Sequence, residues 1–442
     1  MKSKLRQSLG PVGITGQALA TMGLTVTATI NIPQALASGS GLDTWISYAV
    51  ATLVILLVAE TLVLFRHQPP VASGIAGYVS AGLGQVPTAH ACWALVIGYG
   101  AILVSCLSFL SAYLAGFLQM LGWLVQPQLL FLVAGALCLE LARRDTHLSA
   151  STMLLTETIS VLLVMVLCFL IIWKGGIANM NNLETIARMK SHVGPGLMVA
   201  VFSFIGFESA ANLSEETSSP FRSVPLALRI SIVTAGMIFL FWSFVLVQGL
   251  LRLPVSQQLG VDPLVALATQ LGEAPTGFLI MLGATLSLFG CSLGSITALG
   301  RVAYSLAAQQ ILPASLQDIH PRFGTPSTAI ICSTLPLLFG GAGLVGTGMS
   351  PQSLYSQFGG ISVLSFLLVY ALVSCSALRQ RLPGCTQIRR AMVAGSSLIA
   401  ISAVLAAYVS DLAQHQPVLI AAFLVPMVFG SFLTCRSLLI RR

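Results

Sequence analysis

The chain has 442 residues, of which 56% are hydrophobic and only 8% are charged. Soluble globular proteins carry about 25% charged residues, so the composition excludes a soluble enzyme or binding domain and predicts an integral membrane protein. The net charge of +8 fits basic residues gathered on one side of a membrane and implies no nucleic-acid partner.

Apolar segments long enough to cross a bilayer follow one another along the whole chain. A spanning helix needs about 20 mostly apolar residues. We expect an all-α integral membrane protein with twelve transmembrane helices, at approximately 14–37, 45–65, 88–119, 127–142, 149–172, 194–213, 226–250, 273–306, 327–346, 355–376, 391–411 and 415–435. The glycines between residues 73 and 84 follow no strand and precede no Lys-Ser or Lys-Thr pair, so they predict a tight re-entrant or interfacial connection rather than a phosphate loop.

The basic residues set the expected orientation. With the N-terminus in the cytoplasm, only Lys174, Arg188, Lys190 and Arg252 of the 21 basic residues fall on the outer side, which follows the positive-inside rule. We expect a multi-pass protein of the plasma membrane (the inner membrane of a bacterium), with cytoplasmic termini at 1–13 and 436–442. The first apolar stretch is long and is followed at once by another, unlike a cleaved signal peptide.

The first span has the features of a broken helix. Gly23 and several threonines precede Asn31 and Pro33, and hydroxyl groups can satisfy backbone groups that an opened helix frees. We expect the backbone to open at Thr25–Ala28.

The sixth span has a second such point, where Gly206 lies two residues before Glu208. A carboxylate at membrane depth is costly and marks a functional site by default. The alternative is a packing glycine beside a glutamate that hydrogen-bonds a neighbouring helix. For the two interruptions together, the alternative is two ordinary kinked helices in a bundle.

The two interruptions are five spans apart, as in transporters built from inverted repeats. We expect a ten-helix core at 14–376, made of a 5+5 inverted repeat (about 14–172 and 194–376) of the leucine-transporter type, followed by two additional helices at 391–435. The nine cysteines form no CxxC pair or Cys/His metal spacing, so we expect no metal, cofactor or disulfide.

Two blocks of sequence resemble the amino acid–polyamine–organocation permeases. In FIGFESAANLSEETSSPFRSVPLAL and SLGSITALGRVAYSLAAQQILPASLQDIHPRFGTP, the residues that match the family's patterns are Gly206, Glu208, Ser209, Glu215, Glu216, Pro220, Arg222, Pro225, Arg301, Tyr304, Leu306, Ala307, Pro313, His320, Phe323, Gly324 and Pro326. The resemblance covers spans one to ten and is nearest to the arginine/agmatine antiporter subgroup.

The resemblance implies that a substrate carboxylate meets backbone N–H groups of the opened first span, while its ammonium group meets freed carbonyls of spans one and six. The family's Gly-Ser-Gly signature, counted back from Pro33, falls on Val26, Thr27 and Ala28. The predicted substrate-binding residues are Thr25, Val26, Thr27, Ala28, Phe202, Ser203, Ile205, Gly206 and Ile296, with Glu208 in coupling or gating.

The substrate is expected to be a neutral amino acid. The antiporter's two pocket tryptophans fall on Phe202 and Ile296, and tryptophan is the best partner for a cationic side chain. No acidic residue other than Glu208 is expected near the pocket. A cationic amino acid or a polyamine-like amine remains the alternative substrate.

Ion coupling stays open between proton and sodium. Some relatives carry a lysine in span five in place of a sodium ion, and here Ser160 is the expected position. Its hydroxyl could join those of Ser292 and Ser295 in a sodium site, or all three could bond back to their own helices. Glu157 is expected to reach the cytoplasmic interface near Arg143 and Arg144.

Three other classes of function compete with transport. A channel predicts a repeated pore loop or a charged ring, and an enzyme predicts a nucleophile with its base or a metal cluster; the sequence shows neither. Composition does not separate a transporter from a membrane scaffold or receptor. The expected partners are a small amino acid, the lipid bilayer and a proton or sodium ion, and a homodimer is left open.

Overall fold

The computed structural model describes residues 9–68, 74–144, 146–174, 193–258, 260, 262–380 and 386–440. Most of the expected N-terminal segment, most of the outer loop at about 173–193 and the last two residues lie outside these ranges. The predictions for Arg188 and Lys190 therefore stay predictions.

The described residues are helical, and they contain no strand beyond an isolated bridge between Leu9 and Thr217. This confirms the all-α class. Nine helices in this part of the chain are long and apolar enough to cross a membrane, and the first of them is a run over Pro11–Val63 that holds the first two expected spans. The count of twelve spans and the inverted repeat stay predictions.

The helices of the first half, in chain order, are α1 (Pro11–Met22), α2 (Leu24–Val26), η1 (Thr27–Asn31), α3 (Ile32–Ala35), η2 (Leu36–Ser40), η3 (Gly41–Asp43), α4 (Thr44–Val63), α5 (Ile75–Leu83), α6 (Gln85–Met120), α7 (Pro127–Arg144) and α8 (Thr146–Trp173). Those of the second half are α10 (Val193–Phe204), α11 (Ser209–Asn212), η5 (Ser214–Glu216), α12 (Pro220–Leu250), α13 (Val255–Gln258), α14 (Pro263–Gln270), α15 (Ala274–Ala308), η6 (Ala314–Gln317), α16 (Ser327–Gly346), α17 (Pro351–Arg379), α18 (Gln387–His415) and α19 (Pro417–Ile440).

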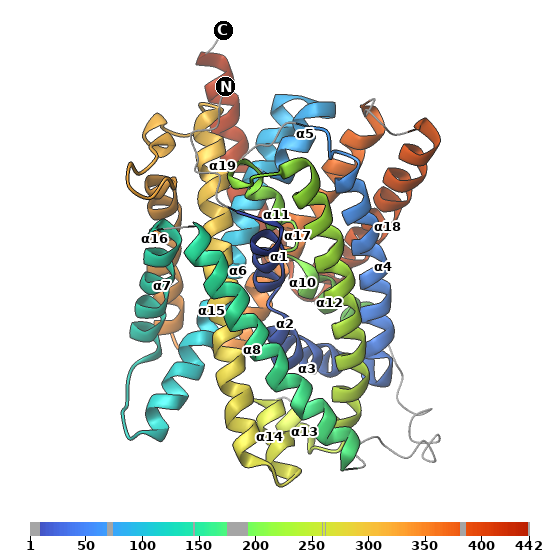
Figure 1. The fold of residues 1–442 in the computed structure, drawn as a ribbon, viewed down its shortest axis with the longest axis vertical. Helices are drawn as coiled ribbons and strands as arrows, with labels where there is room; N and C mark the ends of the chain where they lie inside the picture. The colour runs from blue at the N-terminus through green and yellow to red at the C-terminus, as the bar shows by residue number, and fades with distance from the viewer. Residues whose placement is uncertain are drawn as a thin grey trace.

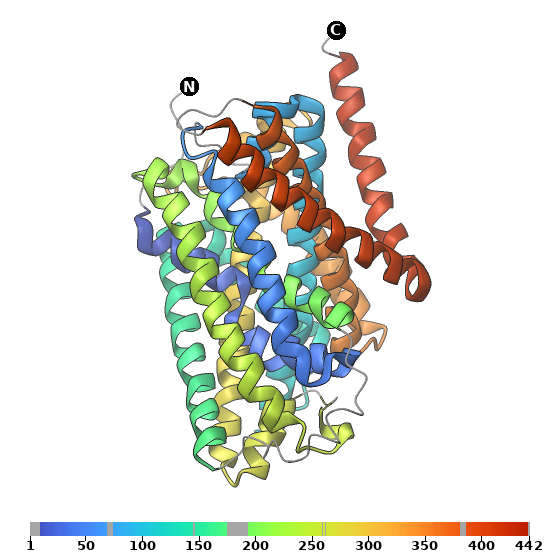
Figure 2. The same ribbon diagram turned by 90° about the vertical axis from the view of Figure 1, so that its right-hand side faces the viewer.

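The long helices run along the long axis of the molecule, with α5 at one end and α13 and α14 at the other (Figure 1). We call these the α5 end and the α13/α14 end. Helix α6 packs against both α15 and α17, and these three are the most enclosed of the described spans, whereas α18 and α19 lie on the outside (Figure 2). The glycine-rich connection forms α5, which packs against α6 and α17.

The interruption of the first span lies at Gly23, and the prediction that Thr25–Ala28 open was wrong. Gly23 ends α1 in the left-handed conformation, with φ +64°, and residues 24–26 are already α-helical again. Residues 27–31 form a π-helical turn. A π-turn holds more residues than an α-turn, so counting back from Pro33 with α-helical spacing places the break too late.

The sixth span is divided between α10 and α11, with a turn over residues 205–208. Gly206 has φ +117°, and a Cβ placed on it would stand 2.8 Å from the carbonyl carbon and oxygen of Thr21. Only glycine fits both this backbone conformation and this close approach. The broken ends of the first and sixth spans are therefore in direct contact.

Candidate functional site

A small enclosed cavity lies where the two broken helices meet. Its volume is about 10 Å³, and it is lined by Thr21, Met22, Val26, Asn31, Ile102, Cys106, Phe202, Ile205, Cys291 and Tyr355. This volume is close to that of a single water probe, so an amino acid can enter only if side chains or helices move.

The predicted site residues divide into two groups around this cavity. Val26, Phe202 and Ile205 line it. The remainder of the predicted set is buried nearby without lining it: Thr25, Thr27, Ala28, Ser203, Gly206 and Ile296. Among these, Gly206 contacts the end of α1 at the Thr21 backbone.

A hydrogen-bond network joins the first span to α4, α10 and α17 on one side of the cavity. Asn31 Nδ2 donates to Ser203 Oγ at 2.9 Å, and Tyr355 Oη donates to Asn31 Oδ1 at 2.8 Å. Ser203 Oγ also lies 3.1 Å from Tyr48 Oη. Asn31 thereby connects the first span to α10 and α17, although the sequence suggested it only as a helix interruption.

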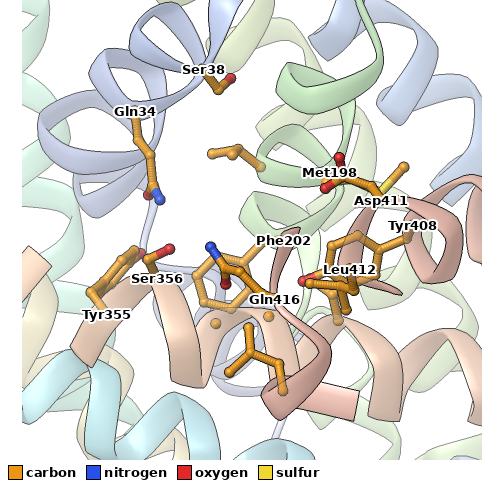
Figure 3. Close-up of a pocket in the computed structure, with 15 residues that line it drawn as sticks. Gln34, Ser38, Met198, Phe202, Tyr355, Ser356, Tyr408, Asp411, Leu412 and Gln416 are labelled. Carbon is orange, nitrogen blue, oxygen red and sulfur yellow. The ribbon is translucent and has the colours of Figure 1, made fainter. Parts of the chain in front are cut away.

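Phe202 and Tyr355 separate the central cavity from larger cavities toward the α13/α14 end. Their rings meet edge to face with centroids 5.6 Å apart. Both residues also line a cavity of about 170 Å³, together with Gln34 and Asp411, and Tyr355 also lines one of about 340 Å³. In Figure 3 the ring of Phe202 lies between Tyr355 on one side and Tyr408 on the other. These two aromatics close the central cavity on that side.

Glu208 is buried and bonded on both carboxylate oxygens. Tyr99 Oη on α6 donates to Oε1 at 2.8 Å, and Tyr370 Oη on α17 donates to Oε2 at 2.8 Å. The Gly206 N–H donates to Oε2 at 3.1 Å, and Asn212 Nδ2 donates to Tyr99 Oη at 3.0 Å. The carboxylate therefore joins the sixth-span break to α6 and α17.

A buried ion pair fastens the α15 helix to the loop after α11. Arg301 Nε donates to Glu216 Oε1 at 2.6 Å and Nη2 donates to Oε2 at 3.1 Å; the two side chains are 0% and 2% exposed. The Leu9 N–H donates to the Glu216 carbonyl, and the Ser218 N–H donates to the Leu9 carbonyl. These contacts hold the start of the described chain against this loop.

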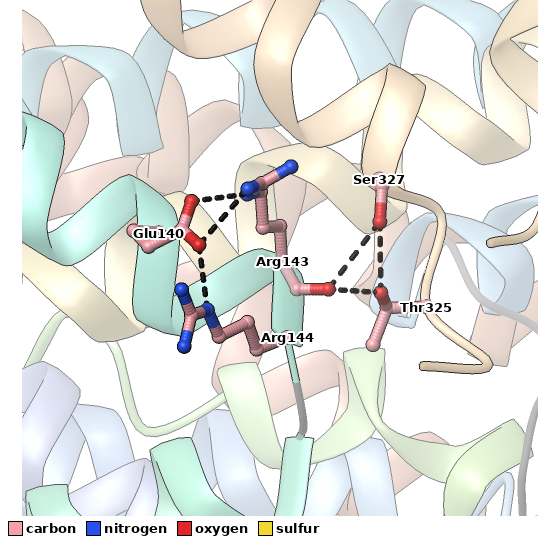
Figure 4. Close-up of polar contacts among 5 residues, drawn as sticks. All are labelled: Glu140, Arg143, Arg144, Thr325 and Ser327. Carbon is pink, nitrogen blue, oxygen red and sulfur yellow. Dashed lines mark hydrogen bonds and ion pairs between the residues drawn. The ribbon is translucent and has the colours of Figure 1, made fainter. Parts of the chain in front are cut away.

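Glu157 does not reach the interface, so the expectation that it lies near Arg143 and Arg144 was wrong. Its side chain is 2% exposed, and the two arginines instead form ion pairs with Glu140, one helical turn earlier on α7 (Figure 4). The Arg143 carbonyl also accepts bonds from Thr325 and Ser327, which join the end of α7 to the start of α16.

Glu157 instead faces the start of α2. Its Oε1 accepts the Thr25 N–H at 3.0 Å, its Oε2 accepts Ser287 Oγ on α15 at 2.8 Å, and the Leu24 N–H also bonds it. The prediction that Glu208 is the sole acid near the site was therefore wrong. Only tertiary packing brings α8 to this position, and no local pattern in the sequence indicates it.

The three serines of the expected sodium site bond to carbonyls of their own helices. Ser160 Oγ donates to Thr156 O at 2.6 Å, Ser292 Oγ to Leu288 O at 2.8 Å and Ser295 Oγ to Cys291 O at 2.8 Å. This is the alternative that the sequence left open. Among the described residues, no group of three or more His, Cys, Asp or Glu side chains could hold a metal ion.

Comparisons with known proteins identify relatives in one family. A family profile described as "Amino acid permease" matches residues 13–431. The branched-chain amino acid permease BcaP of Bacillus subtilis (strain 168) is 24% identical over 317 residues, which make up 67% of this chain and 66% of BcaP. The cationic amino acid transporter 4 of Homo sapiens is 29% identical over 204 residues, 44% of this chain and 31% of that protein.

The chain thus spans slightly less than two thirds of the first relative's length and about a third of the second's. A solved structure described as the substrate-bound outward-open state of a Na+-coupled sialic acid symporter has a TM-score of 0.58, with 15% identity and 90% coverage of each chain. At this identity, the likeness concerns the fold alone.

Proposed function

The chain belongs to the amino acid permease family, and from this premise we propose that it is a secondary active transporter of amino acids, with a neutral amino acid as its main substrate. It works by alternating access in a bacterial inner membrane, with both termini in the cytoplasm. On this orientation the α5 end faces the cytoplasm and the α13/α14 end faces outward.

The observation that carries the proposal is the closed cavity at the contact between the two broken helices. Half-helix ends that meet inside a membrane are the usual place for a transported substrate, because they offer backbone groups to bind it. The backbone of Leu24 and Thr25 would receive the substrate carboxylate, and Val26, Phe202 and Ile205 would surround the rest of the molecule.

The two sides of this cavity have the features of gates. On the outer side, Phe202 and Tyr355 lie between it and the cavity of about 170 Å³, and Tyr355 also borders the cavity of about 340 Å³. On the cytoplasmic side, Glu208 with Tyr99 and Tyr370 would form one barrier, and the Arg301–Glu216 pair a second. Opening these barriers in turn would give alternating access.

The preference for neutral substrates rests on the lining of the central cavity. None of the described residues that line it carries a charge, and both oxygens of Glu157 already bond α2 and α15. A cationic side chain would lose water without gaining an ion pair, which is unfavourable. The human relative named for cationic amino acids makes the opposite preference the main alternative.

Substrate counterflow in proteoliposomes tests both parts of the proposal. Vesicles loaded with a neutral amino acid should accumulate its labelled form, and arginine should compete weakly. None of the described residues that line the cavity is a tryptophan, the best cation–π partner, and a cation–π contact is worth roughly 0.5–2 kcal/mol, up to about thirtyfold in affinity. Arginine or agmatine as the tightest competitor would reverse the proposed selectivity, and the absence of counterflow with every amino acid would favour a scaffold or receptor.

A further inference from the structure

The start of α2 borders the central cavity but is already bonded by a side chain of the protein itself. Residues on both sides of the break, Met22 and Val26, line the cavity. Between them, the N–H groups of Leu24 and Thr25 bond the Glu157 carboxylate. These are first-turn N–H groups, which have no partner within their own helix.

Helical structure continues from Leu24 through η1 and α3 to Ser38, so the positive end of a helix longer than three turns faces Glu157. Such an end favours an anion, and a carboxylate is the group expected there. The side chain of Glu157, on α8, presents to this helix end the same carboxylate group that an amino acid substrate would present.

A second observation at the same turn is the Thr25 hydroxyl. Thr21, Thr27 and Thr29 each donate their hydroxyl to the carbonyl four residues earlier. Thr25 Oγ1 is buried and has no hydrogen-bond partner among the described residues. The carbonyl four residues earlier, that of Thr21, lies before the break and accepts Cys291 Sγ at 3.0 Å. The turn therefore holds a free acceptor beside the bonded N–H groups.

We propose that Glu157 is a tethered competitor of the substrate carboxylate, and that an amino acid binds at the start of α2 only after Glu157 takes up a proton and releases the Leu24 and Thr25 N–H groups. The inference rests on the proposed function. It makes the proton the coupling ion and assigns its carrier.

The reason for the proton is charge balance. Two carboxylates cannot share the same two N–H groups, and like charges at one site disfavour double ionisation. A displaced anionic Glu157 would be a buried charge without a partner, which is strongly unfavourable. One proton from the aqueous side, bound to a carboxylate oxygen, removes the charge, and the new O–H has the Thr25 hydroxyl oxygen as an acceptor on the same turn.

Few other titratable groups contact this carboxylate. The thiol of Cys291 on α15 lies near it and touches Cys106 on α6, with the sulfur atoms 3.3 Å apart. From α15 the carboxylate also faces Ser287, and from the first span it faces backbone N–H groups. Among the described residues, no basic side chain forms an ion pair with Glu157, so no side chain of this part of the protein neutralises it.

Equilibrium binding of L-valine to the full-length protein in nanodiscs, measured from pH 5 to pH 8, tests the proposal. Wild-type affinity should fall as pH rises, by up to about tenfold per pH unit where one proton is taken up with each valine. Glu157→Gln should bind valine at least as tightly as wild type at pH 5 and with no pH dependence. Glu273→Gln, which changes a partly exposed acid paired with Lys174, should keep the wild-type profile.

Two further measurements test the role of the substrate carboxylate and provide a second variant in case Glu157→Gln misfolds. Isobutylamine, which is valine without its carboxylate, should bind wild type and Glu157→Gln equally. Ser287→Ala keeps the acid but removes one of its donors, so it should move the pH profile of valine binding toward higher pH. This variant serves as the test if Glu157→Gln does not fold.

Several results would overturn the assignment. They are valine binding to wild type that is independent of pH, a folded Glu157→Gln protein that keeps the wild-type profile, and a folded Glu157→Gln protein that does not bind valine. Each of these leaves the proposed transport function standing. If no amino acid binds to wild type or variant at any pH, the proposed function itself fails, and the competition with it.

Discussion

Replacing Glu208 with glutamine should weaken the barrier on the α5 side of the cavity. The carboxylate accepts the hydroxyls of Tyr99 and Tyr370 on separate oxygens. An amide of the same shape has only one acceptor oxygen. If that oxygen faces Tyr370 and Gly206, the NH₂ group meets Tyr99, whose hydroxyl already accepts from Asn212, and the Tyr99 hydroxyl loses its acceptor.

The size of the effect follows from the bond that is lost. A hydrogen bond to a charged group contributes about 1.5–3 kcal/mol. If that stabilisation belongs only to the closed barrier, the equilibrium should shift toward opening by about 10- to 150-fold. Counterflow should fall strongly, because the substrate would no longer be enclosed between two barriers.

The native thiol of Cys291 lines the central cavity and reports this opening. In inside-out vesicles, with the other cysteines replaced, a membrane-impermeant maleimide should label Cys291 much faster in Glu208→Gln than in wild type. Tyr370→Phe removes one of the same bonds and should raise labelling too. Labelling within twofold of wild type in both variants, with normal counterflow, would show that Glu208 serves packing alone.

Three other changes test separate parts of the site. Gly206→Ala should lower the free energy of unfolding by at least about 1–3 kcal/mol, because its Cβ would lie 2.8 Å from the Thr21 backbone. Thermal unfolding should show no such loss for the control Gly116→Ala, whose Cβ would meet no described atom within 4 Å. Phe202→Ala should lower substrate affinity and speed labelling of Cys291 from the outer side, and unchanged values of both would remove its role as a lid. Arg301→Met should cost about 3–5 kcal/mol of stability, because it leaves Glu216 charged and buried, whereas the double change with Glu216→Leu should cost much less. A loss in the double variant equal to the sum of the two single losses would mean that the two residues act independently.

The sequence indicated the elements that depend on local chemistry. Gly206 and Glu208 stand out because a flexible backbone and an ionisable group are rare inside an apolar span, and both lie at the sixth-span break. Phe202 was placed by its match to a family position, and the structure puts it in the cavity lining. The partners of Glu208 were not indicated, since Tyr99 and Tyr370 are far away in the chain and aromatic residues are common in membrane helices.

The position of the first break could not be found by counting residues back from Pro33, because the helix between them is irregular. Gly23 was visible in the sequence, but the spacing to Pro33 assumed α-helical turns. The π-turns at residues 27–31 and 36–40 carry extra residues and no strong sequence signature. The observed break at Gly23 therefore lies three residues before Val26, where the family's Gly-Ser-Gly signature was predicted to begin.

The break at Gly23 lies between two half-helices that are held by different partners. The end of α1 contacts Gly206 through Thr21 and accepts a bond from Cys291, whereas the start of α2 is held by Glu157. Gly23 is the one residue between them, and as a glycine in the left-handed region it can change conformation with little steric cost. The two halves of the first span are thus held by different partners on either side of a flexible point. If a substrate takes the place of Glu157, as we propose, it should loosen the hold on α2 while leaving the contact of α1 with Gly206 intact. Substrate binding should then change the angle between the two half-helices.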